Sequence, residues 1–520
     1  MGIRAGVWDG YAGNRGAVVR LACGEAVQDG VRNHHVVLFP LPAQGHLAGF
    51  LALARLLRRE FQDGVTITIV CTPRTVAALR SSVVDADAGS SSSISFHALP
   101  FVPADHGLPA DCESTSSLSN RGDLMKLFEA LDTLEPAFDD FLSSLTGEVH
   151  KGDEEEEPAA ANVCVIADVF VAWTVDVARR RGLAHAFFAS CGAFGSAILH
   201  ALWANIPVLP FGPDGTLRLP EHPTVVLHRS QLSPIFSSGD ERWTAYHRRH
   251  LPRGYLTNAV ISNTVEELEP TGLAMLRRTL GGVPVYPLGP LVRGVPASDE
   301  DDGGSDGTIL SWLDTQRPSS VVYISFGSQN TIRANQMAEL AAALESTGRP
   351  FVWVVRPPVG FDVNGAFRDE WLPGGFEARA RASGRGLVVC GWAPQLRILA
   401  HAATGAFLSH CGWNSVLESL THGVPLLGWP LAAEQFYNVK MLAEEWGACV
   451  EVARGNMESS VVERSRVVEA MEKVMGGTAE SETLRRRVAE ARQVLSRAWA
   501  EDGGSSRAAL HDFFRAMRLR

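Results

Sequence analysis

The sequence predicts an α/β protein with two domains, each built on a parallel sheet. Short β-branched runs alternate with segments whose apolar residues recur at helical spacing, and this alternation is typical of βαβ units. The alternation restarts after an acidic, Gly-rich stretch at 297–307. At 520 residues the chain is also too long for one ordinary core. These three observations favour two α/β domains joined by a linker.

The first half begins with a strand at 34–41, HHVVLFPL, followed by a helix whose apolar residues recur from Leu47 to Phe61. Three more strands are predicted at 65–72, 94–100 and 162–168, the last followed by a helix over 171–181.

No acidic residue, lysine or arginine occurs between Arg181 and Asp214. That length would span a bilayer, but the stretch contains Pro207, Pro210 and several other polar or flexible residues. We therefore expect a strand, a turn and a pocket-lining helix here, and no transmembrane segment.

The second half repeats the pattern of strands separated by helices. Its strands are predicted at 321–328, 351–356, 386–392, 405–410 and 424–430. The predicted organisation is a flexible N-terminal extension at 1–33, an N-terminal domain at 34–296, a linker at 297–310, a C-terminal domain at 311–500 and a C-terminal helix at 501–520. We expect this last helix to pack back on the N-terminal domain. A transit-type leader is the alternative for 1–33, but that stretch carries acidic residues and has no continuous apolar core.

Composition excludes several classes of protein. The net charge of −11 argues against a nucleic-acid surface, which requires clustered positive charge. None of the eight cysteines has zinc-site spacing, so we expect reduced thiols, no metal site and a cytoplasmic location. No GxGxxG, GxxxxGK[ST], HExxH or GxSxG pattern occurs. Nicotinamide-, ATP-, zinc-protease- and serine-hydrolase-type functions therefore lose their usual support.

Ligands of open α/β sheets bind outside the carboxyl ends of the strands. The residues at or just beyond predicted strand ends are His46, Asp168, Ser328, Trp392 and His410. They are the first candidates for a site.

The segment LSHCGWNSVLESL at 408–420 follows a predicted strand and opens a helix. Free backbone N–H groups at a helix N-terminus, together with the helix dipole, attract phosphate groups. His410, Asn414 and Ser415 add polar side chains at the same point. Taken singly, each has a structural alternative, because Asn414 and Ser415 could cap the helix and His410 could be a core histidine.

Residues 392–435 resemble the signature box of the plant family-1 UDP-sugar-dependent glycosyltransferases, with Trp-Ala-Pro-Gln, His-Cys-Gly-Trp-Asn-Ser, Glu and a final acidic–Gln pair in register. The resemblance implies the GT-B fold, two Rossmann-like domains whose parallel sheets face each other across a cleft. It also implies inverting, metal-independent transfer of a hexose to a hydroxyl of a small lipophilic plant metabolite such as a flavonoid, other phenolic or terpenoid. No cofactor is implied, since the UDP-sugar is a co-substrate.

The resemblance gives each residue of the box a role. His410, Asn414, Ser415 and, from another loop, Ser328 hold the diphosphate, and Glu418 accepts the ribose hydroxyls. Trp392 stacks on uracil, whose edge is bonded by Ala393 and Gln395. Trp413 covers the sugar, whose hydroxyls are read by Glu434 and Gln435. The family more often has Asp where this chain has Glu434, and Gln435 is the variant that accompanies UDP-glucose, so glucose is the expected donor sugar.

The stretch PLPAQGHLAGF at 40–50 resembles the family motif whose histidine is the general base, which is His46 here. Gly49 stands where the family usually has Pro, so the following helix is expected to start less rigidly. A histidine can take the proton of an acceptor hydroxyl when a carboxylate orients its other nitrogen. Asp168 resembles the family's aspartate in that role. A backbone-bonded His46 and a helix-capping Asp168 are the alternatives.

The N-terminal half is expected to build the acceptor pocket, with Phe101, Trp173 and Phe194 among its lining residues. Segment 260–270, VISNTVEELEP, also resembles the family and ends this domain. Two other functions stay open from sequence alone: a UDP-sugar-binding regulator with little transferase activity, and a GT-B enzyme such as an epimerase. We expect a monomer with two small-molecule partners, the donor and the acceptor.

Overall fold

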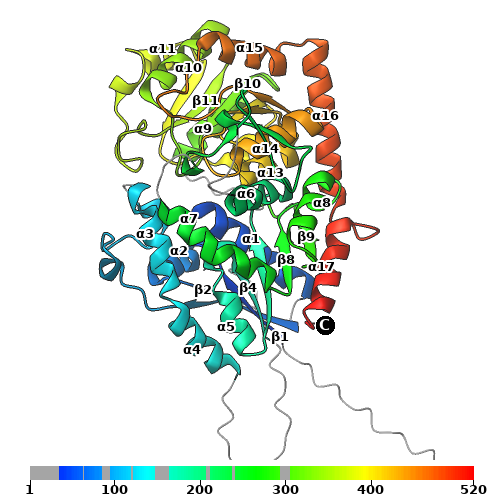
Figure 1. Ribbon diagram of the computed structural model, residues 1–520. Coiled ribbons are helices and arrows are strands. Elements are labelled where there is room, and N and C mark those ends of the chain that lie inside the picture. Colours follow the sequence, from blue (N-terminus) through cyan, green and yellow to red (C-terminus); the bar gives the residue numbers. More distant parts are fainter. Residues whose placement is uncertain are drawn as a thin grey trace, which may run out of the picture. The chain divides into compact units, whose positions relative to one another are not determined.

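The computed structural model of the chain describes residues 34–61, 64–84, 94–118, 121–146, 163–205, 211–236, 241–292 and 305–519. The predicted extension at 1–33 and the first part of the predicted linker lie outside these residues. Figure 1 shows the chain coloured along its sequence.

The N-terminal domain is built on a seven-stranded sheet with the order β3-β2-β1-β4-β5-β8-β9, parallel throughout. Its strands are β1 (His34–Phe39), β2 (Val65–Cys71), β3 (Ser95–Ala98), β4 (Val163–Asp168), β5 (Ala184–Ala189), β8 (Ala259–Ser262) and β9 (Val285–Pro287). Its helices are α1 (Gln44–Phe61), α2 (Pro73–Val84), α3 (Leu124–Asp132), α4 (Glu135–Thr146), α5 (Thr174–Arg180), α6 (Ala193–Asn205), α7 (Glu241–His250) and α8 (Pro270–Thr279). A small antiparallel pair, β6 (Thr216–Arg218) and β7 (Val226–His228), completes it.

Apolar residues on both sides of the central strands explain why this sheet is covered on both faces. In β1, Val37 and Phe39 pack into one core cluster, whereas Val36 and Leu38 pack into another. Successive side chains of a strand point to opposite faces of the sheet. A strand that is apolar at every position must therefore be covered on both faces.

The C-terminal domain has a six-stranded parallel sheet with the order β12-β11-β10-β13-β14-β15. Its strands are β10 (Val321–Ser325), β11 (Phe351–Val355), β12 (Gly386–Cys390), β13 (Thr404–Ser409), β14 (Leu426–Gly428) and β15 (Cys449–Glu451). Its helices are α9 (Ser305–Asp314), α10 (Ala334–Thr347), α11 (Phe376–Ala382), α12 (Gln395–Ala400), α13 (Trp413–His422), α14 (Gln435–Met441), α15 (Arg464–Met475) and α16 (Ala479–Arg497).

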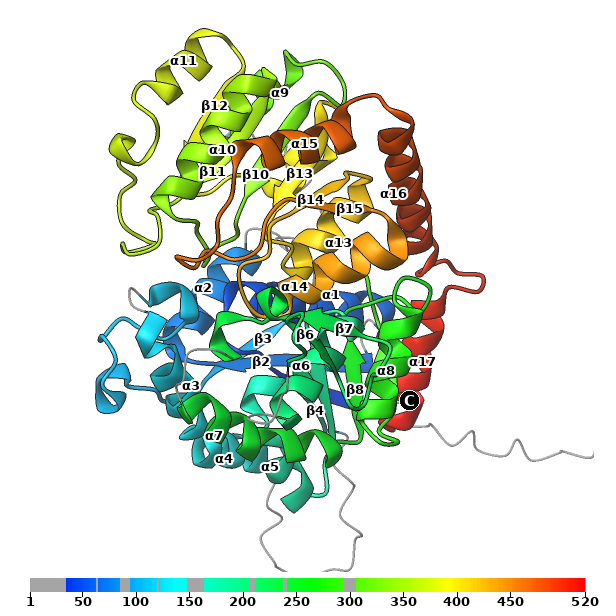
Figure 2. The same ribbon diagram turned by 45° about the horizontal axis from the view of Figure 1, so that its top comes forward.

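In each sheet the strand order reverses between two neighbouring strands, β1 and β4 in the first and β10 and β13 in the second. The loops that leave such a pair diverge, and the crevice between them is where ligands bind. His46 lies in the first turn of α1, just after β1, and Asp168 is the last residue of β4, whereas the loops after β10 and β13 carry Ser328 and His410. Figure 2 shows α14 of the second domain lying over α6 of the first, and the two helices are in contact.

The structure corrects the extent of the predicted linker. Residues 305–310, assigned to it from their composition, form the start of α9, whose Ile309 and Leu313 are buried one turn apart in the core. Two apolar residues at this spacing give the helix an apolar face that packs into the core. The boundary was misplaced because it was drawn from Gly and Asp content, which does not show this spacing.

The C-terminal helix, α17 (Ser505–Ala516), packs on the N-terminal domain. Phe513 and Phe514 lie in the same core cluster as Leu38 of β1, and Phe514 stacks on Phe61 of α1 with ring centroids 3.7 Å apart. Burial of each ring favours this docking by about 1.5–3 kcal/mol.

None of the helices in the described part of the chain combines the length and apolar character needed to cross a bilayer. The seven cysteines among the described residues are all free thiols.

Candidate active site

A cavity of about 210 Å³ opens where the loops of the two sheets meet, and its lining comes from both domains. The residues predicted from sequence that line it are His46, Ser328, Trp392, Ala393, Gln395, His410, Trp413, Asn414, Ser415, Glu418 and Glu434. Asp168 lies directly behind His46, fully buried. The cavity therefore brings together residues that lie up to several hundred positions apart in the sequence.

His46 and Asp168 form a direct pair. Nδ1 of His46 lies 2.6 Å from Oδ2 of Asp168, and the Asp168 side chain is 0% exposed. The other carboxylate oxygen accepts the backbone N–H of Phe170 at 3.1 Å. Asp168 thus caps the short helix that follows it, as one alternative from sequence had it, and at the same time binds His46. With Nδ1 engaged, Nε2 is the His46 nitrogen left for an acceptor proton.

Four influences act on the pKa of His46. Burial lowers it, but the charge of Asp168, the hydrogen bond to Asp168 and the charge of Glu434 together outweigh burial and raise it above the ordinary value of 6.5. Burial raises the pKa of Glu434 in turn, although nearby His46 lowers it. His46 is therefore a stronger base than an exposed histidine.

The N-terminus of α13 faces the cavity without a side-chain cap. Gly412 is its N-cap residue and makes no side-chain cap hydrogen bond, so the alternative that Asn414 and Ser415 merely cap this helix is wrong. The first backbone N–H groups of a helix have no intrahelical partners, and this end carries partial positive charge. Nδ2 of Asn414 instead donates to the carbonyl oxygen of Gly45, 2.8 Å away in the other domain.

His410 fits under this helix end because its neighbours are glycines. A Cβ on Gly327 would lie 2.7 Å from Nε2 of His410, and one on Gly412 would lie 2.6 Å away. Burial lowers the pKa of His410 to about 4, although a backbone hydrogen bond with Ser325 opposes the shift. The ring is therefore neutral at pH 7 and can donate one hydrogen bond without carrying charge.

The turn that leads into α13 holds a backbone conformation unusual for a side chain. Cys411 has φ 58°, in the left-handed region, and its N–H is bonded to Oγ of Ser409 at 3.0 Å. Nδ2 of Asn438 donates to its carbonyl oxygen at 2.9 Å. Such a conformation costs of order 1–3 kcal/mol and persists where surrounding contacts enforce it. Here the contacts aim the first turn of α13 at the cavity.

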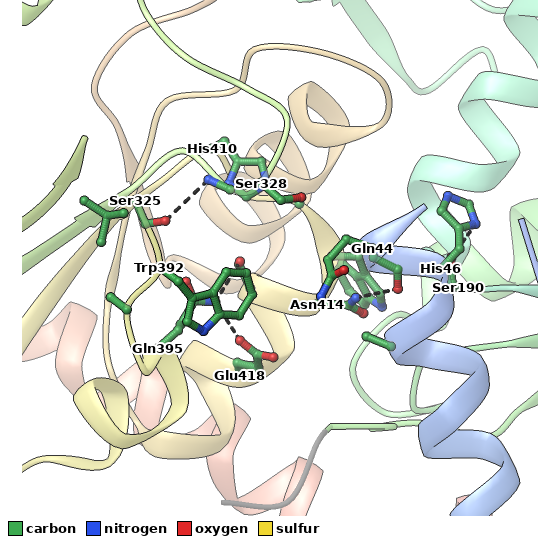
Figure 3. Close-up of a pocket in the computed structure, with 18 of the residues that line it drawn as sticks. Gln44, His46, Ser190, Ser325, Ser328, Trp392, Gln395, His410, Asn414 and Glu418 are labelled. Atoms are coloured by element: carbon green, nitrogen blue, oxygen red, sulfur yellow. Dashed lines mark hydrogen bonds between the residues drawn. The ribbon is translucent and has the colours of Figure 1, made fainter. Parts of the chain in front are cut away.

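Glu418 and Gln395 form the floor of the cavity below Trp392 (Figure 3). Nε2 of Gln395 donates to Oε2 of Glu418 at 2.6 Å and to Oγ of Ser415 at 3.1 Å, while its Oε1 accepts the Tyr323 hydroxyl at 3.2 Å. Glu418 is 2% exposed, whereas the Trp392 ring is 54% exposed. Glu418 is thus a fixed carboxylate and not a solvated one, and Trp392 is an open platform and not core.

Two residues of the box have buried side chains that bond to backbone groups. The Trp413 indole lines the cavity, is 3% exposed and donates Nε1–H to the carbonyl oxygen of Asn263 at 2.5 Å, so the ring also ties the two domains together. Gln435 is 6% exposed and lies outside the cavity lining. Its Oε1 accepts the backbone N–H groups of Leu431 and Ala432, both at 2.9 Å.

The three aromatic residues predicted to line an acceptor pocket are core residues. Phe101, Trp173 and Phe194 are 7%, 2% and 4% exposed and pack inside the hydrophobic clusters of the domains. None lines the cavity at His46. The error has a physical reason, because most aromatic rings in an α/β domain fill its interior and composition alone cannot separate them from pocket walls.

Gly49 does not affect the start of the helix that carries His46. The helix α1 begins at Gln44, so Gly49 lies inside it, where it is buried. A Cβ there would touch Phe188 and Ser190 at 3.4 Å.

Sequence reasoning missed several polar residues of the cavity, among them Ser190, Ser325 and Arg356. Ser190 follows β5 and its Oγ lies 3.3 Å from Nδ1 of His46. Arg356 follows β11, between the loops of Ser328 and Trp392 in strand order. All three residues lie at or just after the carboxyl end of a strand. The rule that selected His46 and His410 from sequence would therefore have selected them too.

The fold and the cavity define a GT-B glycosyltransferase. Residues 33–293 match the family described as "Glycosyltransferase, N-terminal domain", and residues 308–484 match "UDP-glucoronosyl and UDP-glucosyl transferase". The chain belongs to the plant family-1 UDP-dependent glycosyltransferases. It transfers a sugar from a UDP-sugar, which is its co-substrate.

Similarity to known members extends over nearly the whole chain. UDP-glycosyltransferase 92A1 of Arabidopsis thaliana is 38% identical over 93% of this chain and 96% of its own length. Crocetin glucosyltransferase 3 of Crocus sativus is 39% identical over 83% of this chain and 89% of its own. The crystal structure of Medicago truncatula UGT71G1 complexed with UDP-glucose superposes with a TM-score of 0.75 at 26% identity, covering 94% of this chain and 99% of that one.

Proposed function

We propose that this enzyme transfers glucose from UDP-glucose to a hydroxyl of a small lipophilic plant metabolite, such as a flavonoid, another phenolic or a terpenoid, with inversion at the anomeric carbon. The observation that carries the proposal is the His46–Asp168 pair, 2.6 Å apart, in the same cavity as the N-terminus of α13.

The reaction is a single displacement. The acceptor oxygen attacks the anomeric carbon of the sugar from the face opposite UDP, and the bond from that carbon to the diphosphate oxygen breaks. Nε2 of His46 takes the acceptor proton, and buried Asp168 stabilises the resulting imidazolium. UDP leaves with the electron pair, and an α-linked donor yields a β-glucoside.

The leaving diphosphate gains negative charge, which the N-terminus of α13 is suited to accept. The free N–H groups of the first turn offer donors there, and Ser328 and Ser415 add hydroxyls, while neutral His410 lines the same part of the cavity with its N–H bonded to the Ser325 backbone. Preorganised donors at a developing charge commonly supply several kcal/mol of transition-state stabilisation. No step of the proposal requires a metal ion.

Glucose is proposed on the identity of Gln435, the variant that accompanies UDP-glucose, and on relatives that are named glucosyltransferases or bind UDP-glucose. Glu434 lines the cavity beside His46 and is the second candidate for the sugar hydroxyls.

Two half-buried rings near His46, those of Phe170 and His247, support a flat, apolar acceptor. The Phe170 ring lies 5.7 Å from the His46 ring, edge to face, and contacts His247, which stacks on Trp203 at 3.8 Å. Burial lowers the pKa of His247 to about 3, so its ring is neutral. Phe170 and His247, which are only partly buried, replace Phe101, Trp173 and Phe194 as the proposed acceptor contacts. Phe170→Ala should weaken acceptor binding by roughly 0.5–1.5 kcal/mol, whereas Phe361→Ala, at an exposed ring of the other domain, should not.

The test is incubation of the purified enzyme with UDP-glucose, UDP-galactose or UDP-glucuronate and a mixed extract of plant metabolites. We expect products heavier by one hexose with UDP-glucose, and a β-anomeric proton signal in their NMR spectra. His46→Ala should lose turnover by about 10²–10⁴-fold while it still binds UDP. Wild-type turnover in that variant would refute His46 as the base, and UDP binding without any transfer by the wild type would refute the proposed acceptor class.

A further inference from the structure

The segment 263–269, NTVEELE, lies between β8 and α8 and contacts both the donor-binding and the base-carrying parts of the cavity. Asn263 and Glu269, at its two ends, are both 0% exposed. Neither residue lines the cavity itself.

Two tryptophans of the C-terminal domain donate their indole N–H groups to this segment. Trp413, the first residue of α13, bonds the carbonyl oxygen of Asn263 at 2.5 Å. Trp446, at the end of the π-helical turn 442–446 that follows α14, bonds the carbonyl oxygen of Leu268 at 2.8 Å. The two carbonyl groups are five residues apart, so the segment is held at both ends.

The same segment holds the loop beside the base. The N–H of Asn263 donates to the carbonyl oxygen of Ala189 at 3.1 Å, directly before Ser190, which contacts His46. The carboxylate of Glu269 accepts the N–H groups of Ala193 and Phe194, at 2.8 and 3.1 Å, and so caps the start of α6.

The loop between Ala189 and Ala193 is also in close contact with Trp413. A Cβ on Gly192 would lie 2.7 Å from a Glu269 oxygen and 2.9 Å from the Trp413 ring, so only glycine fits there. A continuous set of buried contacts therefore joins the first turn of α13 to the loop that touches His46.

We infer that segment 263–269 is a positioning element that sets the N-terminus of α13 at the correct separation from His46, with Trp413, Trp446 and Glu269 as its positioning residues. This inference rests on the proposed function, in which His46 is the base and α13 holds the diphosphate. In-line displacement requires the acceptor oxygen and the anomeric carbon to meet within a narrow range of distance, and a misplacement of about 1 Å can cost about 100-fold in rate. UDP, by contrast, contacts one domain through the proposed donor residues, so its affinity is expected to be insensitive to this separation.

The test is Trp446→Phe, which removes the indole N–H together with the five-membered ring, at a residue outside the cavity. We expect kcat to fall about 10-fold, with UDP affinity by calorimetry within twofold of wild type. The matched control is Trp312→Phe, whose indole donates to the carbonyl oxygen of Gly384 at 3.3 Å within the C-terminal domain. That variant should keep wild-type kcat.

Glu269→Gln supplies an independent test, because the amide keeps the size of the side chain but carries only one acceptor oxygen. It should also lower kcat more than UDP affinity. The inference is overturned by wild-type kcat in Trp446→Phe, by a parallel loss of UDP affinity, or by an equal loss of kcat in Trp312→Phe. A wild-type enzyme that binds UDP but transfers no hexose would instead count against the proposed function itself.

Discussion

Asn414 and Gly45 are hydrogen-bonded across the two domains: Nδ2 of the asparagine donates to the glycine carbonyl oxygen at 2.8 Å. Asn414 belongs to the first turn of α13, and Gly45 directly precedes His46. The element proposed to hold the diphosphate therefore touches the first turn of α1, the helix that carries the proposed base. Several predictions about charge and geometry depend on this proximity.

The pH dependence of turnover should report the pKa of His46. The base must be unprotonated, and its pKa is raised above 6.5, so kcat/KM should increase with pH through that raised value. Asp168→Asn removes the negative charge and leaves a neutral, weaker acceptor, which should move this rise in kcat/KM to lower pH while reducing maximal turnover. Glu434→Gln should move it in the same direction by less. If kcat/KM rises at the same pH in both variants as in wild type, the assignment of His46 as the base is contradicted.

The same pair should affect stability with the opposite sign. A group whose pKa is raised on folding stabilises the folded state fully below its unfolded pKa, and this contribution is lost as pH rises through the folded value. The His46–Asp168 pair should therefore favour folding most below about pH 6.5, where activity is lowest. Urea unfolding of wild type and Asp168→Asn at several pH values measures this difference, which should shrink as pH rises.

Glu418→Ala should weaken donor binding by ~1–3 kcal/mol if the carboxylate accepts ribose hydroxyls. The variant also leaves Nε2 of Gln395 without its 2.6 Å partner. Calorimetry with UDP and 2′-deoxy-UDP separates the two effects, because only the ribose contact distinguishes these ligands. If Glu418→Ala discriminates between them as strongly as wild type does, the ribose role is wrong.

Arg356→Gln should weaken UDP binding more than uridine binding. Arg356 is the one arginine or lysine lining the described cavity, its Nε is buried without a partner, and burial lowers its pKa. An unpaired guanidinium in a partly buried site is stabilised by an anionic ligand, and a charge-assisted hydrogen bond contributes about 1.5–3 kcal/mol. Arg381→Gln, an exposed change on α11, is the control. Equal losses for UDP and uridine would place Arg356 at the uracil ring and not at the phosphates.

Gln435→His should shift donor preference from UDP-glucose toward UDP-galactose. It should also cost about 1–3 kcal/mol of stability, because Oε1 of Gln435 accepts two backbone N–H groups in the loop before α14. The ratio of kcat/KM for the two donors and a urea unfolding curve measure the two effects. An unchanged ratio in a folded variant would show that position 435 does not determine the choice of donor sugar.

The fold was accessible from sequence because strands and helices leave local periodicities. Both parallel sheets follow from apolar runs and their spacing, as do the strand that ends at Asp168 and those that precede His46 and His410. The signature segment also identified the family, since its polar residues occur in register. The errors occurred where a residue's environment depends on distant parts of the chain, as for Phe101 and Trp173, whose rings are core.

The sequence by itself determined the two α/β domains, the family and the residue types available for chemistry, because these depend on local pattern and on motif order. Only the tertiary structure decided which partner each side chain has. Trp413 bonds Asn263, 150 residues away, and Asn414 bonds Gly45, 369 residues away. Sequence spacing carries no information on such contacts, because they form only when two separately folded sheets bring their loops together.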